Sequence, residues 1–279
     1  CPICGNPTPR LLADKVEDMP LCKDCAAKID LPNGALNQMS LDDFRRYLEL
    51  YDENQPLRES FSETYHYGFG FLGGQLVFDC TNRLLKLRNS QSAWAIEGPQ
   101  IKSFRIMEDE DVLFEGDCTG LRRHNNDVES RVNAMEPYIR EFYMELRNYE
   151  QMEHIRELRN RDRDDDDSRL SSPPQPTFDT PAPVQHFSID ICLDHPFWGS
   201  FEQDIKAPGF DSYEPSLTSY LDDYRAKVEE LHTLAVNLME LLAPGAPEVS
   251  VSAAASAAAQ SAPAVDVVDQ LQKYKALLD

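Results

Sequence analysis

The 279-residue chain is poor in basic residues and has no long apolar run. Lysine and arginine number 27 against 49 aspartate and glutamate residues, so the formal net charge is −22 at pH 7. This balance opposes contact with the phosphate backbone of a nucleic acid, and the segment 1–30 has no excess of basic side chains either. No apolar stretch reaches the roughly 18 residues that a membrane-spanning helix requires. Nucleic-acid binding and a transmembrane segment are therefore disfavoured.

Familiar catalytic motifs are also lacking. The sequence contains no HExxH motif, no phosphate-binding P-loop and no nucleophile elbow. Gly68, Gly70 and Gly73 have the spacing of a dinucleotide loop, but the aromatic residues between them are typical of a strand and no helical pattern follows. The acidic run 164–167 lacks the glycine and the distal glutamate of a calcium-binding loop, so we expect a solvated linker there.

Cysteines stand out among the residues that are present. Cys1 and Cys4 form one Cys-x-x-Cys pair, Cys22 and Cys25 form another, and seventeen residues separate the two pairs. Each pair aims two sulfurs at one point, and Gly5 allows the first pair to turn sharply, so the four thiolates fit a tetrahedral Zn²⁺. Structural disulfides or a redox pair are the alternatives. The spacing predicts a closed structural zinc site.

The remaining cysteines are scattered through the chain at Cys80, Cys118 and Cys192. We expect them to be small buried hydrophobic residues in a reducing compartment. No secretory leader is evident in the sequence, and we therefore predict a cytoplasmic protein, with contact at the membrane periphery as an alternative.

A helix is expected to follow the second cysteine pair from about Ala26, and another to begin after Ser40. Ser40 has the character of an N-cap, with Asp43 three residues later as the capping-box acid. The apolar positions of this second helix recur at three- and four-residue steps as far as Tyr51, which predicts a face packed on a core.

The pattern changes between Ser60 and Gly116, where short β-rich runs are separated by turn residues. The expected strands are 65–71, 75–80, 84–87, 93–96, 104–107 and 112–115. Runs at this spacing indicate an antiparallel sheet or a small barrel.

Residues 126–163 are expected to be helical and highly charged, with a narrow apolar stripe. The members of that stripe are Tyr138, Phe142, Leu146, Tyr149 and Met152. The segment 168–184 is rich in serine, proline and threonine, a composition that predicts disorder. Alternating apolar residues then predict a half-buried strand at 187–193, and the broad apolar face of a helix over 216–242 is expected to cover the sheet.

Near the end of the sequence, an Ala/Ser/Pro linker at 244–264 precedes an amphipathic segment at 265–279. Its apolar positions share one helical face, which is typical of an interaction element. We expect this segment to bind a protein partner or to mediate self-association.

Three stretches resemble known families. The pattern CPICG…LADKVEDMPLCKDC resembles a zinc-ribbon-like bacterial domain of unknown function. The stretch 61–115 is similar to the β-rich, pleckstrin-homology-like segment that often follows it, and 265–279 resembles the first half of a SHOCT (short C-terminal) domain. The first two resemblances imply an uncharacterised bacterial cytosolic protein. The third implies oligomerisation or docking on other proteins.

Together these observations predict an α+β chain with a zinc-ribbon-like module, an antiparallel β-rich middle packed by a long helix, and a helical C-terminal element. The expected segments are the module 1–30, a helical connector 31–59, the β-rich part 60–125, a charged helix and disordered insertion 126–185, a completing strand and helix 186–243, the linker 244–264 and the SHOCT-like start 265–279.

The leading functional hypothesis is a non-enzymatic zinc-containing adaptor or scaffold, because no stretch of the sequence assembles a catalytic constellation. One alternative is docking to a membrane surface through the β-rich domain, with Lys86, Arg88, Lys102 and Arg105 as a local basic patch. Another alternative is an uncharacterised hydrolase that uses His66, His195 or Asp194, although a histidine beside proline is more often structural.

Overall fold

The computed structural model describes residues 1–31, 34–70, 74–87, 94–161 and 172–251. The chain divides into two compact units. Among the described residues, unit 1 comprises those of 1–125, 187–205 and 231–251, and unit 2 comprises those of 126–186 and 206–230. Helices and sheets are mixed throughout, which confirms the α+β class.

Unit 1 begins with the cysteine-rich segment and a helical connector. Its first elements, in chain order, are β1 (Lys15–Val16), β2 (Met19–Pro20), α1 (Lys23–Ala26), the 3₁₀ helix η1 (Ala35–Gln38), α2 (Leu41–Glu53) and α3 (Gln55–Ser60). The predicted helix from Ala26 is wrong in its start, because α1 begins inside the second cysteine pair. The predicted capping box of α2 is confirmed: Ser40 and Asp43 exchange hydrogen bonds.

The expectation of one antiparallel sheet or barrel is corrected, because unit 1 holds two larger sheets. One has four strands in sequence order, β3 (Tyr65–Gly68), β4 (Gln75–Asp79), β5 (Leu84–Leu87) and β6 (Ala95–Glu97). The other has the order β11-β10-β7-β8-β9-β12. Its members are β7 (Ile101–Glu108), β8 (Asp111–Asp117), β9 (Gly120–His124), β10 (His186–Leu193), β11 (Ser200–Lys206) and β12 (Glu248–Val251). A short 3₁₀ helix η2 (Gly98–Gln100) links the two.

Strand β10 confirms the alternating pattern predicted for 187–193. Its side chains are buried at every second position, and its register places Ile189 opposite Ile106 and Ile191 opposite Phe104 on β7. Strand β12 corrects the prediction of a structureless linker from 244, because Glu248–Val251 pair in parallel with β9. The sheet is therefore not purely antiparallel.

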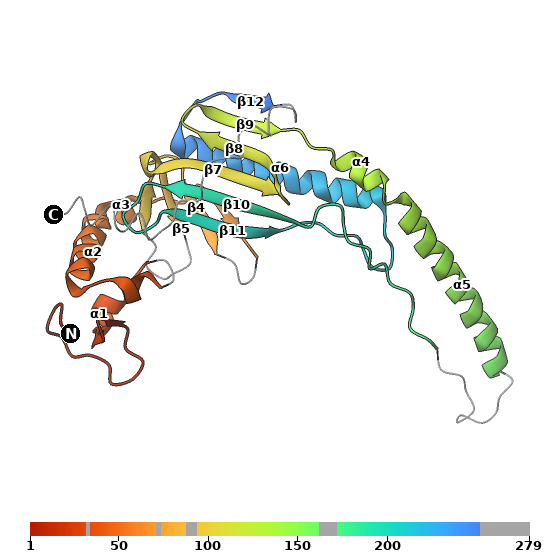
Figure 1. Cartoon of the computed structure of the whole chain (residues 1–279), viewed down its shortest axis with the longest axis horizontal. Helices are drawn as coiled ribbons and strands as arrows, with labels where there is room; N and C mark the ends of the chain where they lie inside the picture. The colour runs from red at the N-terminus through yellow and green to blue at the C-terminus, as the bar shows by residue number, and fades with distance from the viewer. Residues whose placement is uncertain (32–33, 71–73, 88–93, 162–171, 252–279) are drawn as a thin grey trace. The chain divides into compact units, whose positions relative to one another are not determined.

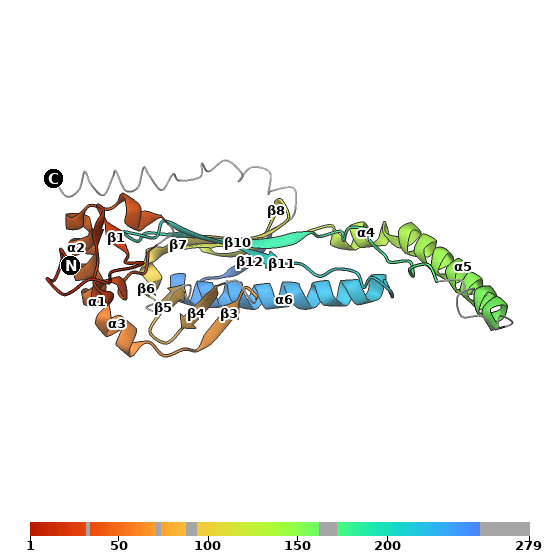
Figure 2. The same cartoon turned by 90° about the horizontal axis from the view of Figure 1, so that it is seen from below.

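Helix α6 (Leu217–Leu242) has its C-terminal half in unit 1, between the two sheets (Figure 2). Phe114 of β8 packs against His232 on one side, and Cys80 after β4 approaches Asn237 on the other. Leu234 and Leu241 of this half are also fully buried. The helix is apolar over most of its circumference because it has a sheet on two sides.

The end of α6 depends on a close backbone contact at Gly98. Arg83 donates from its guanidinium to the carbonyls of Leu241 and Leu242 at 2.7–3.0 Å, and thereby satisfies two of the acceptors that a helix end leaves free. A Cβ atom on Gly98 would lie 2.1 Å from the Leu241 carbonyl oxygen.

We therefore expect Gly98→Ala to lower the free energy of unfolding by about 1–3 kcal/mol, because backbone must shift to relieve the overlap. Denaturant unfolding would measure the change. Gly68→Ala is the control, since nothing lies within 4 Å of its Cβ position. Equal stability of the Gly98 and Gly68 variants would contradict the assigned contact.

Unit 2 is built on α4 (Val128–Asn133), α5 (Glu136–Arg161) and the N-terminal half of α6. The chain from 172 onward runs back alongside α5 without regular structure (Figure 1). Phe178 is nevertheless buried in a cluster with Ile139 and Phe142 of α5. The prediction of disorder is therefore wrong for 172–184, because a buried aromatic anchors a segment whose composition is otherwise polar.

The apolar stripe predicted for α5 is also corrected. Phe142 is buried and Leu146 is partly buried, but Tyr138 and Met152 are more than half exposed. The buried side instead carries Ile139, so the packed face is rotated from the predicted one.

Candidate metal centre

The first cysteine pair is shaped by a tight turn. The amide of Gly5 donates to the carbonyl of Cys1 at 2.9 Å, and Gly5 itself has a φ of 77°, a conformation that glycine adopts without strain. This turn brings the sulfurs of Cys1 and Cys4 within 4.8 Å of one another.

The second pair lies at the start of α1. Cys22 is the N-cap residue, and its sulfur accepts from the Cys25 amide at 3.5 Å. The Ala26 amide donates to the Cys22 carbonyl at 2.9 Å. The capping role places Cys22 and Cys25 on one side of the first helical turn, and both are buried.

The β1–β2 hairpin brings the two pairs together. Glu17 and Asp18 at its tip have φ angles of 49° and 62°, the left-handed conformation of a two-residue hairpin turn. The Leu21 amide then donates to the Asp14 carbonyl at 2.8 Å, and Val16 and Leu21 are fully buried. The intervening residues thus form a small structured element that returns the chain to the first pair.

All four sulfurs converge within 4.8 Å of one another. The separations are 3.4 Å between Cys4 and Cys22, 3.7 Å between Cys4 and Cys25, and 3.9 Å between Cys1 and Cys25. A tetrahedral zinc–thiolate centre with bonds near 2.3 Å has sulfurs about 3.8 Å apart, whereas a disulfide has them near 2.05 Å. The cysteines are free thiols, and their geometry is compatible with a bound metal.

The electrostatics of the cluster favour a cation. The backbone amide of Cys25, aided by neighbouring thiols, holds the pKa of Cys22 below its ordinary value. Burial, together with the nearby sulfurs of Cys22 and Cys4, raises the pKa of Cys25 to about 12. Four thiolates at this separation would repel one another, and a divalent ion removes that cost by ligating all of them.

Asp30, which the sequence analysis did not single out, ties the cysteine module to the rest of unit 1. Its amide donates to the Tyr47 hydroxyl at 2.7 Å, and its buried carboxylate accepts from the amide of Trp94. The indole of Trp198 donates to the Asp30 carbonyl at 3.3 Å. Tyr47 in turn donates to the carbonyl of Lys28 at 2.6 Å. Three other segments, around Tyr47, Trp94 and Trp198, therefore meet at Asp30, the last residue of the module.

The proposed hydrolase residues have other partners. His66 is exposed and lies 2.9 Å from Glu63, and Asp194 forms a 2.7 Å ion pair with Lys102. His195 is buried against Trp94, and burial lowers its pKa to about 4. Across the described ranges, no hydrogen bond or ion pair links these three candidates to one another.

The basic patch is divided between the two sheets. Lys86 lies on β5 over the ring of Phe61, at 4.1 Å from its centroid, whereas Lys102 and Arg105 lie on β7. Arg88 lies outside the described residues.

The other cysteines differ from the prediction. Cys118 is exposed, and Cys80 and Cys192 are half-buried. The prediction of small buried residues is therefore wrong for Cys118, and Cys80 and Cys192 are only partly buried.

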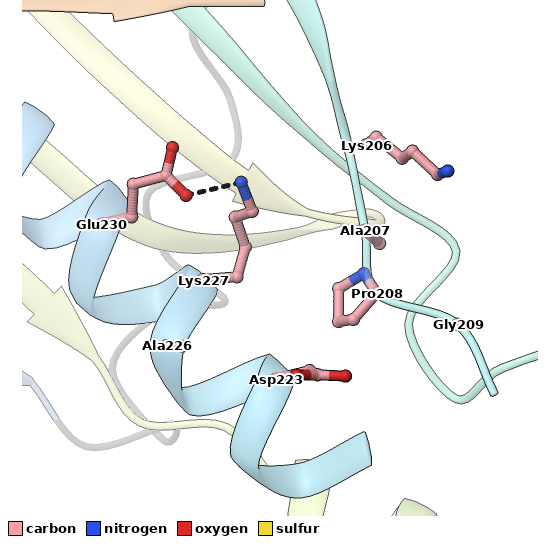
Figure 3. A pocket seen from close by; sticks show the side chains of 8 residues that line it. All are labelled: Lys206, Ala207, Pro208, Gly209, Asp223, Ala226, Lys227 and Glu230. Carbon is pink, nitrogen blue, oxygen red and sulfur yellow. Dashed lines mark hydrogen bonds and ion pairs between the residues drawn. The ribbon is translucent and has the colours of Figure 1, made fainter. Parts of the chain in front are cut away.

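A cavity of ≈ 400 Å³ lies in unit 2 between α6 and the chain that follows β11. Figure 3 shows Lys227 and Glu230 turned toward one another at its wall, where they form a 2.6 Å ion pair, with Asp223 one turn away. These lining charges are mixed in sign, and the cavity is wide open. It presents no convergent set of groups around a reacting atom.

Comparison with protein-family models, with curated proteins and with solved structures found no match. In the part of the chain that the structure describes, no helix combines the length and the apolar character needed to cross a membrane.

Proposed function

We propose that this protein is a non-enzymatic zinc-containing scaffold of the bacterial cytoplasm. The observation that carries the proposal is the convergence of Cys1, Cys4, Cys22 and Cys25 on one point. Four protein thiolates fill a tetrahedral zinc, and such a closed centre has no position for water or substrate. Its work is structural, because it fixes the fold of residues 1–30 and, through Asp30, their attachment to α2.

The finer fold assignments are part of the same proposal. A zinc ribbon is supported by the hairpin that joins the two cysteine pairs. A pleckstrin-homology-like middle is supported by antiparallel strands followed in the chain by the long helix α6. Docking of this domain on a membrane surface is the second candidate function. It predicts co-sedimentation of the protein with anionic liposomes that weakens as salt is added.

The assembly function is assigned to the SHOCT-like segment 265–279, which lies outside the described residues. A linker that tethers a short amphipathic helix to a protein already bound nearby raises the effective concentration of that helix near its binding site. This property is useful in a scaffold.

We expect a protein that ends at residue 264 to lose most of its co-purifying partners or its own higher oligomers. Chemical cross-linking followed by mass spectrometry would measure the loss. The matched variants replace Leu271 and Leu277 by serine on the apolar face, and Asp269 and Lys273 by serine off that face. The leucine variant should behave as the truncation does and the Asp269/Lys273 variant as wild type. Full retention of partners by the truncated protein would overturn this assignment.

A further inference from the structure

Helix α5 of unit 2 has two apolar sides, and the residues that the structure describes cover only one of them. On the covered side, Ile139 and Phe142 pack against Phe178, and the Tyr149 hydroxyl donates to the carbonyl of Pro173 at 3.2 Å. Met144, Met152, Ile155 and Leu158 lie on the other side of the helix, each 44–58% exposed. We call these four residues the Met144–Leu158 stripe.

The stripe is unusual for a helix in water. Its members recur at steps of eight, three and three residues, which keeps them on one side of an α-helix. Helices gain most of their stability in proteins from packing an apolar face, and the half of α5 after Leu146 has its stripe exposed. A partner that covered the stripe would remove four large apolar side chains from water.

The charges beside the stripe identify the partner. Glu145 and Arg159 lie on the same edge of the stripe, each seven residues from Met152. Within the described ranges, neither forms an ion pair. Two antiparallel copies of α5 that cross at Met152 bring the same edges together, so that Glu145 of each copy faces Arg159 of the other.

We infer that the Met144–Leu158 stripe is a self-association surface, through which two copies of this protein pair with their α5 helices antiparallel. The inference rests on the proposed assembly function and gives it a second contact, separate from 265–279. Asn148 and Gln151 also lie within the seam. Their amides weaken the contact but restrict its register, as polar seam residues do in coiled coils.

A lipid surface is a poorer occupant than a second copy. Membrane-binding helices carry basic residues along their polar face, whereas Glu141 and Glu145 border this stripe in a chain of net charge −22. A pair of single helices is also a small interface, so we expect a dimer that forms and dissociates with concentration.

Sedimentation velocity of the full chain over a range of concentrations tests the inference. Wild type should dimerise. The symmetric dimer contains two Glu145–Arg159 pairs. Glu145→Arg and Arg159→Glu should each weaken dimerisation about tenfold, because each variant turns both pairs of opposite charges into pairs of like charges. The double variant E145R/R159E restores both opposite pairs and should dimerise as wild type does. Glu150→Arg is the matched control, since Glu150 is exposed on α5 away from the stripe.

Three results would overturn the inference: wild type that is monomeric at every concentration, single variants that dimerise like E150R, or a double variant that stays as weak as the singles. Circular dichroism of each variant verifies that α5 remains folded. A protein that ends at residue 264 separates the two proposals. If this truncated protein still dimerises and E145R weakens its dimerisation, the α5 surface is supported even if the assignment to 265–279 fails.

Discussion

Replacement of Cys25 by serine is expected to abolish binding of the proposed zinc and to unfold the segment 1–30. Structural zinc sites contribute apparent free energies of about 10–16 kcal/mol to the folding of small modules at pH 7. The module of this protein has few other sources of stability: apart from Cys22 and Cys25 themselves, Val16, Leu21 and Asp30 are its only buried residues among 1–30. Loss of one thiolate of four therefore removes most of what keeps the hairpin and α1 together.

Elemental analysis of protein purified under reducing conditions would measure the effect, with about one zinc per chain in wild type and close to none in Cys25→Ser. Hydrogen exchange should show loss of protection within 1–30, while the strands of the two large sheets stay protected. Cys118→Ser is the matched control, because Cys118 is an exposed free thiol remote from the cluster in sequence. Wild-type protein without metal under these conditions would refute the zinc site.

The second large effect is a loss of stability in mild acid caused by His195. Its imidazole is packed 5.0 Å from the ring of Trp94, and its Nδ1 accepts from the amide of Phe197 at 3.2 Å. Its Nε2 is buried and, among described residues, has no hydrogen-bond partner. Burial lowers the pKa of His195 to about 4 from an ordinary 6.5.

Because the unfolded chain binds a proton near pH 6.5 and the folded chain does so only near pH 4, acid favours unfolding between these values. The stability that His195 contributes is complete above pH 6.5 and declines by as much as about 3 kcal/mol as the pH falls to 4. Denaturant unfolding at several pH values would measure this decline.

The comparison with His195→Gln isolates the histidine from other groups. Asp190 acts in the opposite direction, since burial and the charge of Glu202 raise its pKa. The variant should be less stable at pH 7.5, because ring packing is lost, and should have a flatter pH dependence between 6.5 and 4. His66→Gln serves as the control, because His66 is exposed. An identical pH slope in wild type and His195→Gln would rule out the assigned role.

The metal cluster and several local elements could be predicted from the sequence. The cysteine spacing encodes two tight turns, and Ser40 with Asp43 encodes the start of α2, because both depend on residues only three or four positions apart. The strand around Ile189 and the helix from Leu217 follow in the same way from a period of two or of 3.6 residues.

The covered side of α5 could not be predicted in this way. The helix has two apolar sides, and the predicted stripe combined Phe142 and Leu146 of the covered side with the exposed Tyr138 and Met152. Phe178 and Phe210, which come from later segments, decide instead that Ile139 and Phe142 face inward. Similarly, β12 forms in an Ala/Ser/Pro-rich stretch because β9 offers it an edge to pair with.

The burial and hydrogen bonding of Asp30 also could not be predicted from the sequence. In the sequence, Asp30 cannot be distinguished from an exposed acidic residue; it is buried because Tyr47, Trp94 and Trp198 pack around it and form hydrogen bonds with it.

The sequence by itself determined the features that depend on near neighbours: the four-sulfur site, the helix start at Ser40, and the periodic strands and helices. Tertiary structure decided how those elements pair, which apolar stripe is buried and which stays exposed, and that two sheets rather than one enclose α6. The physical reason is that turns, caps and periodicity are short-range properties of the chain. Burial depends instead on all the apolar surfaces of the chain at once, and its outcome is decided by residues such as Phe178 and Phe210 that lie tens of positions from the helix they cover.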